Sequence, residues 1–349
     1  MGRRPSNRPT SFDIAYRAGV SQPTVSRALR GSKAISAKTR ERIEAIAREL
    51  NYSVDKNASS LRSQRSNTIA LLFFEEDSLG DSKINPFFLA MLGSITRHCA
   101  TRGLDLLISF QRMEDNWHMR YLDSHRADGL ILLGYGDYAL YRSRLRQLVE
   151  HGTHFVRWGA VDDPAFGAAI GSDNVAAGRL AGEHLLGLGR RRIAFLGQAD
   201  EHYPEFADRY GGLCEALDAH GIVPDDALRR NTISHEGLGR AAMEDILHSG
   251  APFDAVFAAS DLIALGAMAA LRAAGKSVPE DVALIGFDDL PAAAMASPAL
   301  TTLSQDMKGA GERLVDTLLA RIEEREPPSP LLATRLIVRE SCGAQHQAI

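Results

Sequence analysis

The sequence predicts an α/β protein in which a small helical head precedes a larger body built from two doubly wound parallel sheets. Helical patterns fill the beginning of the chain, whereas short β-branched apolar runs alternate with amphipathic stretches after about residue 67. Charge changes at the same place, because residues 1–65 hold 14 Lys and Arg against 5 Asp and Glu, and the rest hold 26 against 39. A basic head on an acidic body is typical of a polyanion-binding module fused to a separate domain.

The composition fits a globular protein with two or three domains, since 349 residues with 45% hydrophobic side chains can bury several cores. Cys99, Cys214 and Cys342 lie far apart and show no zinc spacing, which favours free thiols in a reducing compartment. No apolar run follows the basic N-terminus, and the longest uncharged apolar run, 262–271, is too short to span a bilayer. We therefore expect a cytoplasmic protein without membrane contact.

The first helix is expected over residues 11–18, with signals at both of its ends. Thr10, followed three residues later by Asp13, forms a capping box that marks the start. Gly19 marks the end, because glycine adopts the left-handed conformation that terminates helices.

A second helix is expected from Ser21 to Leu29, with Ser21 as its N-cap. Pro23 is tolerated there, because the amide groups of a first helical turn have no partner within the helix. The apolar side of this helix consists of Val25, Ala28 and Leu29. The outward side carries amide, hydroxyl and guanidinium groups that can read base edges or hold phosphates, on Gln22, Thr24, Ser26 and Arg27.

A third helix follows Ser36, where apolar residues repeat at helical spacing at Ile43, Ile46, Ala47 and Leu50. The three helices together give a helix-turn-helix head with its own small core. The polar and basic segment after Tyr52, DKNASSLRSQRSN, cannot bury enough surface to fold alone. It is either a plain linker or a hinge that becomes helical on DNA, placing Leu61 between base steps while Arg62 and Arg65 meet phosphates.

The body alternates predicted strands and helices, which implies βαβ units in parallel sheets. The strands are expected at 69–74, 106–110, 130–133, 155–158, 193–196, 255–258 and 282–287. The helices are expected at 87–102, 141–150, 175–188, 209–219, 241–247 and 262–273. So many strands indicate two sheets and hence two lobes.

Polar and aromatic residues follow the predicted strands, where doubly wound sheets bind ligands. They are Asp137, Arg157, Trp158, Ser260, Asp261, Asp288 and Asp289. Carboxylates accept hydroxyl donors, arginine donates in a fork, and an aromatic face covers the C–H face of a sugar ring. These residues therefore suit a polyhydroxylated ligand, although Asp261 and Asp289 could equally cap helices or face solvent.

Residues 10–66 resemble the head and hinge of the lactose-repressor and purine-repressor family, through DIAYRAGVSQPTVSRAL and the stretch from NASSL. In that family the two residues after the turn serine, here Gln22 and Pro23, and the later arginine, here Arg27, touch bases. The resemblance implies DNA contacts by Thr10, Ser21, Gln22, Pro23, Thr24, Ser26, Arg27, Ala58, Leu61 and Arg62. Pro23 lacks a side-chain donor, so direct reading should depend on Gln22, Thr24 and Arg27.

The body resembles the effector domain of the same family and, behind it, periplasmic sugar-binding proteins. The similar segments follow in family order: NPFF, DGLI, GSDN, GRRRIAFLG, VALIGFDD, PALTTLSQD and LIVRES. The resemblance implies effector contacts by Asn85, Phe87, Phe88, Asp137, Arg157, Trp158, Arg209, Ser260 and Asp288. The acidic loop before Asn85 and the Arg157–Trp158 strand end depart from the family, which leaves the identity of the effector open.

The resemblance also implies a division into a head (1–55), a hinge helix (56–66) and an effector-binding, dimerising body (67–349). Its first lobe would comprise about 67–159 and 303–332, and its second about 160–302 and 333–349. The implied function is a homodimeric transcriptional regulator of near-palindromic double-stranded DNA. It would act as a repressor of carbohydrate-utilisation genes, with a sugar-like effector between its lobes.

Two alternatives remain open from the sequence. One is a corepressor-dependent regulator that binds a purine or another non-sugar metabolite, and the other is an enzyme with an appended DNA-binding head. GLGRAA at 237–242 satisfies a dinucleotide motif but does not emerge from a long strand, and His151 and His154 lack a third metal ligand. No serine-hydrolase elbow or P-loop occurs, so we expect no catalytic residue, cofactor or metal.

Overall fold

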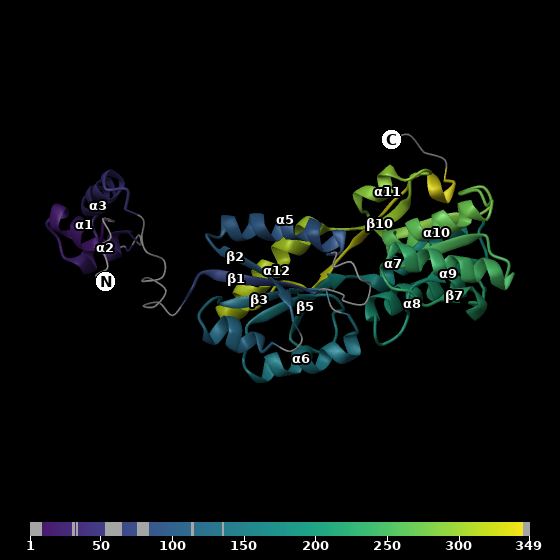
Figure 1. Cartoon of the computed structure of the whole chain (residues 1–349), viewed down its shortest axis with the longest axis horizontal. Helices are drawn as coiled ribbons and strands as arrows, with labels where there is room; N and C mark the ends of the chain where they lie inside the picture. Colours follow the sequence, from purple (N-terminus) through teal and green to yellow (C-terminus); the bar gives the residue numbers. More distant parts are fainter. Residues whose placement is uncertain are drawn as a thin grey trace, which may run out of the picture. The chain divides into compact units, whose positions relative to one another are not determined.

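The computed structural model describes residues 9–29, 32, 34–52, 65–74, 84–112, 115–134 and 136–344. The chain divides into two compact units, and the boundary falls between Ser66 and Asn67. Figure 1 shows the first unit as a cluster of helices and the second as two α/β lobes. No helix among the described residues is both long and apolar enough to cross a membrane.

The head consists of α1 (Ser11–Ala18), α2 (Gln22–Leu29) and α3 (Ala37–Glu49). The predicted capping box is present, because Asp13 N donates to Thr10 Oγ1 over 3.4 Å and Thr10 N donates to Asp13 Oδ2 over 2.7 Å. Gly19 ends α1 with a left-handed φ of 58°. One buried cluster joins the three helices, with Ile14, Ala15, Ala18, Val25, Ala28, Ile43 and Ala47 at its centre. The three predicted helices are therefore confirmed.

The first lobe of the body is a six-stranded, entirely parallel sheet of order β11-β5-β4-β3-β1-β2. Its strands are β1 (Thr68–Phe74), β2 (Asp105–Gln111), β3 (Gly129–Leu133), β4 (Phe155–Trp158), β5 (Ala168–Ser172) and β11 (Leu331–Leu332). Helices α5 (Pro86–Thr101) and α12 (Met307–Ile322) cover one face, and α6 (Tyr138–Glu150) with the π-helix η2 (His118–Asp123) covers the other (Figure 1). Successive strand residues therefore face different layers.

The second lobe is a six-stranded sheet of order β12-β10-β9-β8-β6-β7, in which only β12 runs antiparallel to its neighbour. Its strands are β6 (Ile193–Leu196), β7 (Arg229–Arg230), β8 (Ala255–Ala258), β9 (Ala283–Asp288), β10 (Thr301–Gln305) and β12 (Thr334–Ile337). Its helices are α7 (Asn174–Gly187), α8 (Pro204–Ala219), α9 (Glu236–Ser249), α10 (Asp261–Ala273) and α11 (Pro291–Met295). Short 3-10 turns lie at Asp226–Leu228 and Glu340–Cys342, and a third, Pro164–Phe166, precedes β5 in the first lobe.

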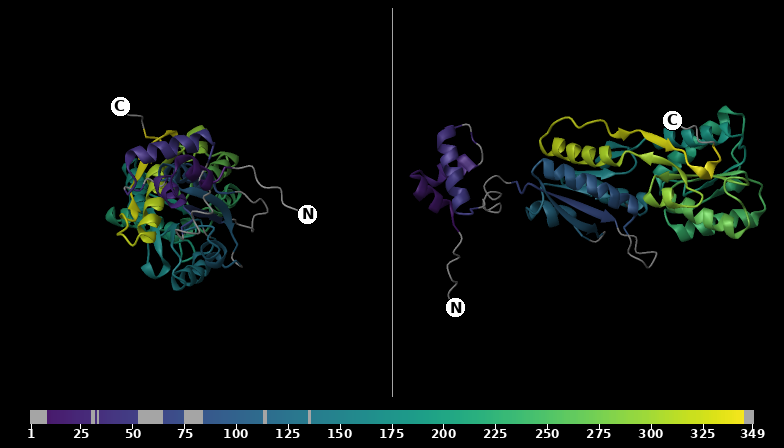
Figure 2. Two further views of the ribbon diagram at one scale, coloured as in Figure 1. Left: turned by 90° about the vertical axis from the view of Figure 1, so that its left-hand side faces the viewer. Right: turned by 90° about the horizontal axis from the view of Figure 1, so that it is seen from above.

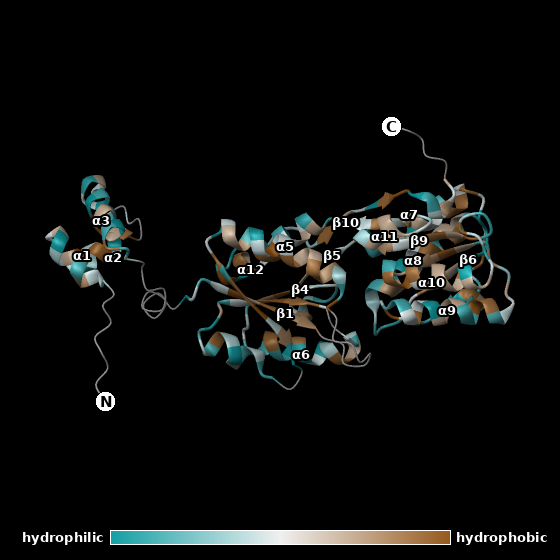
Figure 3. Ribbon diagram, turned by 45° about the horizontal axis from the view of Figure 1, so that its top comes forward, coloured by the Kyte–Doolittle hydropathy of each residue, from teal (hydrophilic) through white to brown (hydrophobic). Residues whose placement is uncertain are grey.

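The hydropathy colouring in Figure 3 follows these layers, because the strands are mostly hydrophobic and the outer helix surfaces carry the hydrophilic residues. The α/β class with two sheets of mostly parallel strands is thus confirmed. All seven predicted strands and all six predicted helices of the body occur, with ends that differ by a few residues at most sites.

The chain passes from one lobe to the other three times, and we call these passages crossovers. They lie between β5 and α7, between β10 and α12, and between β11 and β12. A single residue, Asp306, separates β10 from α12. Figure 2 shows the yellow C-terminal part of the chain running between the two lobes. Because β5 pairs with β4, the first lobe continues to Ser172, which corrects the expected boundary near residue 159.

Candidate functional site

A cavity of about 710 Å³ lies between the two lobes of the body, where the carboxyl ends of both sheets meet. Its apolar wall is largely aromatic, with Phe74, Phe87, Phe88, Phe110, Trp158, Tyr203 and Phe206. Its polar wall includes Asn85, Glu205, Arg209, Ser234, His235, Glu236, Ser260, Asp288 and Gln305. A concave site with an apolar lining and a few convergent polar groups is typical of small-molecule binding.

Arg209 enters the cavity wall from α8, and it is almost fully buried. Its Nε donates to Asn174 Oδ1 over 2.9 Å, and Nη1 donates to the carbonyl of Ala259. The guanidinium carbon lies 3.5 Å from the centre of the Phe287 ring, so a cation–π contact fixes the plane of the fork. The position depends on tight helix packing, since a Cβ on Gly178 of α7 would approach the Arg209 carbonyl oxygen to 2.0 Å.

Asp288 is the last residue of β9, and its backbone is unusual for a residue with a side chain. Its φ is 118° and that of Asp289 is 57°, so the chain leaves the strand through two residues with positive φ. The Asp288 carboxylate accepts a hydrogen bond from Gln305 Nε2 over 2.7 Å. Burial raises the pKa of Asp288 to about 7, although the Arg209 guanidinium favours the charged form.

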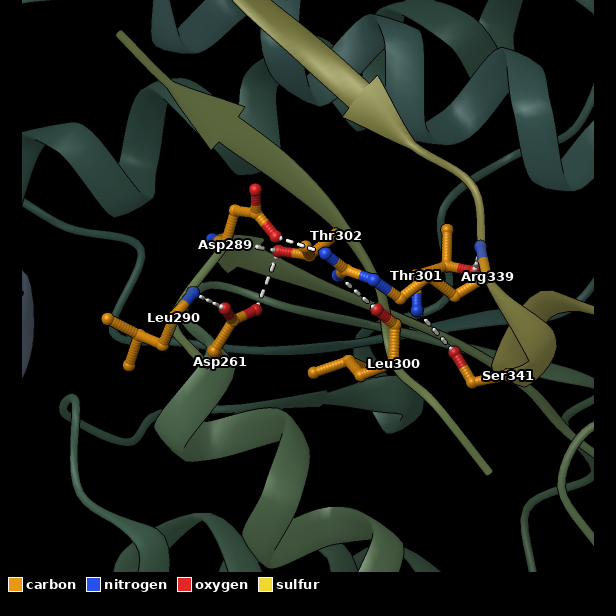
Figure 4. Close-up of polar contacts among 8 residues, drawn as sticks. All are labelled: Asp261, Asp289, Leu290, Leu300, Thr301, Thr302, Arg339 and Ser341. Carbon is orange, nitrogen blue, oxygen red and sulfur yellow. Dashed lines mark hydrogen bonds and ion pairs between the residues drawn. The ribbon is translucent and has the colours of Figure 1, made fainter. Parts of the chain in front are cut away.

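A network behind Asp288 holds this strained segment in place (Figure 4). Asp261 Oδ2 accepts from the amide of Leu290 over 2.7 Å, and Oδ1 accepts from the Thr302 hydroxyl over 2.6 Å. Asp289 Oδ1 accepts from Arg339 Nη2 over 2.6 Å. Burial, together with the neighbouring Asp288, raises the pKa of Asp261 to about 8. The side chains of Asp261 and Asp289 therefore support the backbone that carries Asp288.

Polar contacts also join the two lobes across the cavity. Ser260, the N-cap of α10, accepts from the Ser234 hydroxyl over 2.8 Å. Asn85 belongs to the first lobe, and its Nδ2 donates to Ser234 Oγ over 3.4 Å. Asn85 also caps α5, because its Oδ1 accepts from the amide of Phe87 over 3.0 Å. Ser234 was not expected from the sequence, and it connects two predicted residues.

The aromatic wall is a packed set of rings beside these polar groups. The ring centres of Phe87 and Phe88 lie 5.3 Å apart, and those of Phe87 and Trp158 lie 5.8 Å apart. Both contacts are edge-on or tilted, which is the favoured geometry for aromatic pairs. The cavity therefore offers a bound molecule both apolar ring surface and charged groups.

Seven of the nine residues expected to bind a small molecule line this cavity: Asn85, Phe87, Phe88, Trp158, Arg209, Ser260 and Asp288. Asp137 does not, which corrects the expectation. It caps α6 by accepting from the amide of Leu140 over 3.2 Å, and its other oxygen pairs with His202 Nδ1 over 2.7 Å. His202 lies in the second lobe, so Asp137 forms an ion pair between the lobes.

Arg157 does not line the cavity either, because it lies on the α6 side of the first sheet while Trp158 lies on the side of α5 and α12. Its guanidinium pairs with Asp162, and it also donates to the Tyr138 hydroxyl over 2.9 Å and to the Ala160 carbonyl over 2.8 Å. Because successive side chains of a strand point to opposite faces of the sheet, Arg157 and Trp158 lie on different sides, although both were expected to contact the effector.

Several cavity residues were not expected from the sequence. Phe74, Phe110 and Gln305 lie at or near the ends of β1, β2 and β10, so the strand-end rule applies to them as well. Tyr203 and Phe206 come from the start of α8, which begins at Pro204 and not near Arg209 as expected. No group of three His, Cys, Asp or Glu side chains suited to a metal ion occurs in the part of the chain that the structure describes.

The head presents the outward side of α2, as expected. Ser21, Pro23 and Arg27 are exposed, whereas Val25 and Ala28 are buried. Ser21 caps α2, because its Oγ accepts from the amide of Thr24 over 3.4 Å and lies 2.9 Å from Thr24 Oγ1. Thr24 and Ser26 are half-buried.

Two further contacts concern residues expected to meet DNA. Gln22 is half-buried, and its Nε2 donates to Ser11 Oγ over 3.2 Å, which holds its amide against α1. Thr10 caps α1. Ala58, Leu61 and Arg62, with most of the expected hinge helix, lie outside the described residues.

Comparison with known proteins agrees with this arrangement. Residues 12–55 match the family model described as bacterial regulatory proteins, lacI family, and residues 183–342 match a periplasmic binding protein-like domain. The HTH-type transcriptional regulator CelR of Thermobifida fusca is 34% identical over 350 residues, which cover 98% of this chain and 100% of that protein.

Two solved structures are similar over nearly the whole chain. One is the transcriptional regulator CelR–cellobiose complex, with 32% identity and a TM-score of 0.69 over 96% of this chain and 100% of that chain. The other is the lac repressor dimer bound to operator and the anti-inducer ONPF, with 27% identity and a TM-score of 0.78 over 97% and 100%.

A helix-turn-helix head joined to a two-lobed body with a ligand cavity defines a DNA-binding transcriptional regulator. The chain belongs to the lacI family of bacterial regulatory proteins.

Proposed function

We propose that this protein represses carbohydrate-utilisation genes and that a small sugar, bound between the two lobes, controls its affinity for operator DNA. The observation that carries the proposal is the cavity, whose lining combines Arg209 and Asp288 with a largely aromatic wall. The relatives named above are transcriptional regulators. This supports a cavity that binds its ligand without converting it. The proposed place of action is the cytoplasm, where bacterial DNA lies.

Each part of the cavity has a role in the proposed sugar complex. The Asp288 carboxylate accepts hydrogen bonds from neighbouring hydroxyls, and the Arg209 fork donates to ring or hydroxyl oxygens. The aromatic rings cover the C–H faces of the sugar, which are apolar. Asn85, Ser260, Phe87, Phe88 and Trp158 complete the proposed set of contacts. The cellobiose in the CelR complex supports a sugar of one or two rings.

On the DNA side, we assign the reading of bases to α2 in the major groove. Gln22, Thr24 and Arg27 would contact base edges, while Thr10, Ser21, Pro23 and Ser26 would lie against the backbone. Two chains would bind as a symmetric dimer, because one short helix reads too few bases and a two-fold pair reads a near-palindrome. The operator-bound lac repressor dimer supports this assembly. Ala58, Leu61 and Arg62 keep their proposed role in the minor groove.

One feature favours a second candidate ligand. Phe74, Phe110, Tyr203 and Phe206 all line the cavity, and stacked aromatic rings also suit a planar base such as a purine. A purine corepressor would strengthen operator binding, whereas a sugar inducer would weaken it. The two candidates therefore predict effects of opposite sign on DNA affinity.

A thermal-shift screen tests the proposal directly. The panel contains glucose, ribose, galactose, cellobiose and lactose, together with adenine, guanine, hypoxanthine and nucleosides. A ligand at 100 times its Kd stabilises the folded protein by about 2.7 kcal/mol, which raises Tm measurably. We expect one or more sugars to do so. Stabilisation by purines alone would support the second candidate, and a panel without any effect would contradict both.

The role of α2 is tested by Arg27→Ala. We expect affinity for an operator selected from random duplexes to fall by about 1–3 kcal/mol, while affinity for scrambled DNA changes much less. Fluorescence anisotropy at fixed salt measures both. Arg17→Ala is the matched control, because Arg17 is exposed on α1 and pairs with Glu49 of α3 over 3.8 Å. Equal losses on operator and scrambled DNA would remove Arg27 from base reading.

A further inference from the structure

Two buried charged groups of the cavity wall, Arg209 and Asp288, are connected by a series of buried hydrogen bonds. Arg209 Nε donates to Asn174 Oδ1 over 2.9 Å, and Asn174 Nδ2 donates to the carbonyl of Ser172 over 3.1 Å. The Ser172 hydroxyl donates to Gln305 Oε1 over 2.6 Å. Gln305 Nε2 donates to Asp288 Oδ1 over 2.7 Å. We call these five residues the relay.

Every hydrogen bond in the relay runs in the same direction, from the cation to the carboxylate. Each amide therefore has one defined orientation, because the oxygens of Asn174 and Gln305 face donors and their nitrogens face acceptors. Hydrogen bonds that share one direction polarise one another, and in a buried setting the loss of one link leaves its neighbours unsatisfied. All five residues are buried, with exposed fractions between 5% and 8%. The two halves of the relay meet at Ser172, whose backbone carbonyl accepts from Asn174 and whose hydroxyl donates to Gln305.

The middle of the relay lies at the junction of the lobes. Ser172 ends β5 and Asn174 begins α7, so the two residues flank the first crossover. Gln305 ends β10 just before α12, at the second crossover. A rotation of one lobe against the other must turn these two segments. The hydrogen bond between Ser172 and Gln305 is therefore sensitive to lobe geometry, although Ser172 does not line the cavity.

We propose that Ser172, Asn174 and Gln305 are positioning residues that transmit effector binding from Arg209 and Asp288 to the two crossovers. The inference rests on the proposed function, because it assumes an effector in this cavity. An effector that engages Arg209 and Asp288 changes the charge at both ends of the relay, and the crossovers respond through the Ser172–Gln305 link. The relay also holds Arg209 and Asp288 at a fixed separation before the effector arrives.

The test replaces the middle of the relay with Ser172→Ala. Ser341→Ala is the matched control, because Ser341 is also buried in the body and its hydroxyl donates to the Leu284 carbonyl and accepts from the Thr301 amide. In the unliganded protein, carbon NMR of labelled aspartate follows the titration of Asp288, assigned by its loss in Asp288→Asn. We expect Ser172→Ala to raise the pKa of Asp288, since a freed Gln305 donates less well to the carboxylate. Ser341→Ala should leave it unchanged.

The second measurement compares operator affinity with and without saturating cellobiose, or the best sugar of the panel. The quantity compared is operator affinity without sugar divided by operator affinity with sugar. We expect Ser172→Ala to lower this ratio by about threefold or more, with operator affinity in the absence of sugar nearly unchanged. If no sugar alters operator binding by the unmodified protein, the proposed function fails, and the Asp288 titration decides on the relay alone. Equal titration of Asp288 in Ser172→Ala and Ser341→Ala would overturn the relay. Should Ser172→Ala not fold, Ser172→Cys, whose thiol is a weaker donor of similar size, serves in the same titration.

Discussion

Replacing Arg209 by methionine is expected to abolish the response to sugar while operator binding without sugar persists. The substitution keeps much of the side-chain volume but removes the contacts to Asn174, Ala259 and Phe287. It also takes away the nearby guanidinium that favours the charged form of Asp288. A hydrogen bond to a charged group contributes about 1.5–3 kcal/mol, so loss of the Arg209 donor corresponds to roughly a 10- to 100-fold loss of sugar affinity.

Isothermal titration calorimetry measures the sugar affinity, and anisotropy measures operator binding. Arg179→Met is the control, because Arg179 lies on the adjacent helix α7 in an exposed pair with Glu215. Exposed pairs contribute about 0–1 kcal/mol, so this variant should respond to sugar normally. Sugar affinity that survives in Arg209→Met would place the effector outside the cavity described above.

Sugar affinity is expected to fall by about tenfold for each pH unit below about 7, because Asp288 must be ionised to accept hydroxyl donors. Burial raises the pKa of Asp288 to about 7, so its carboxylate is already partly protonated near neutral pH. In Asp288→Asn, affinity should be low and nearly independent of pH over this range. Asp226→Asn, a change at an exposed residue of the second lobe, should keep the wild-type profile.

The same pKa values predict the opposite trend for the stability of the unliganded protein. Asp288 and Asp261 have raised pKa values in the folded state, so the folded state holds protons that the unfolded chain has released above about pH 4. The free energy of unfolding should therefore decrease as pH rises from about 4 to about 8. Urea titrations across this range measure the slope, and Asp288→Asn should reduce it.

The interlobe pair of Asp137 and His202 would not produce the fall in sugar affinity that we expect below pH 7. The hydrogen bond to Asp137 raises the pKa of His202, so the charged pair is present at low pH and is lost as pH rises. This contact therefore favours closed lobes under acidic conditions. A fall in sugar affinity below pH 7 would be due to the cavity and not to the contact between the lobes.

The sequence predicted the head and most of the body because helix caps and strand periods are local signals. It did not predict β5, whose segment AAIGS holds only one β-branched residue. It also did not predict α12, because Gly309 and Gly311 weaken the helical pattern of its first turns. The structure gives the reason for Gly311, since a Cβ there would lie 2.5 Å from Ser94 Cβ of α5. Close packing of two helices determined that residue, and packing cannot be read from a local pattern.

The cavity was predicted less completely than the fold. Strand ends correctly drew attention to Trp158, Ser260 and Asp288, since topology brings the carboxyl ends of parallel strands together. The rule does not say which side of a sheet a side chain faces, so it could not separate Arg157, on the α6 side, from Trp158, which lines the cavity. Nor does it detect contacts between lobes, so Asp137 was expected to meet a ligand and meets His202 instead.

The position of α12 in the first lobe has a consequence for synthesis of the chain. Leu314, Val315 and Leu318 of this helix are buried with α5 against strands that end at or before residue 172. During translation the first lobe therefore stays unfinished, with one apolar face of its sheet covered by α5 alone, until nearly the whole chain has left the ribosome. The two lobes must mature together, and a premature stop after β10 would yield a fragment in which a nearly complete second lobe accompanies an aggregation-prone first one.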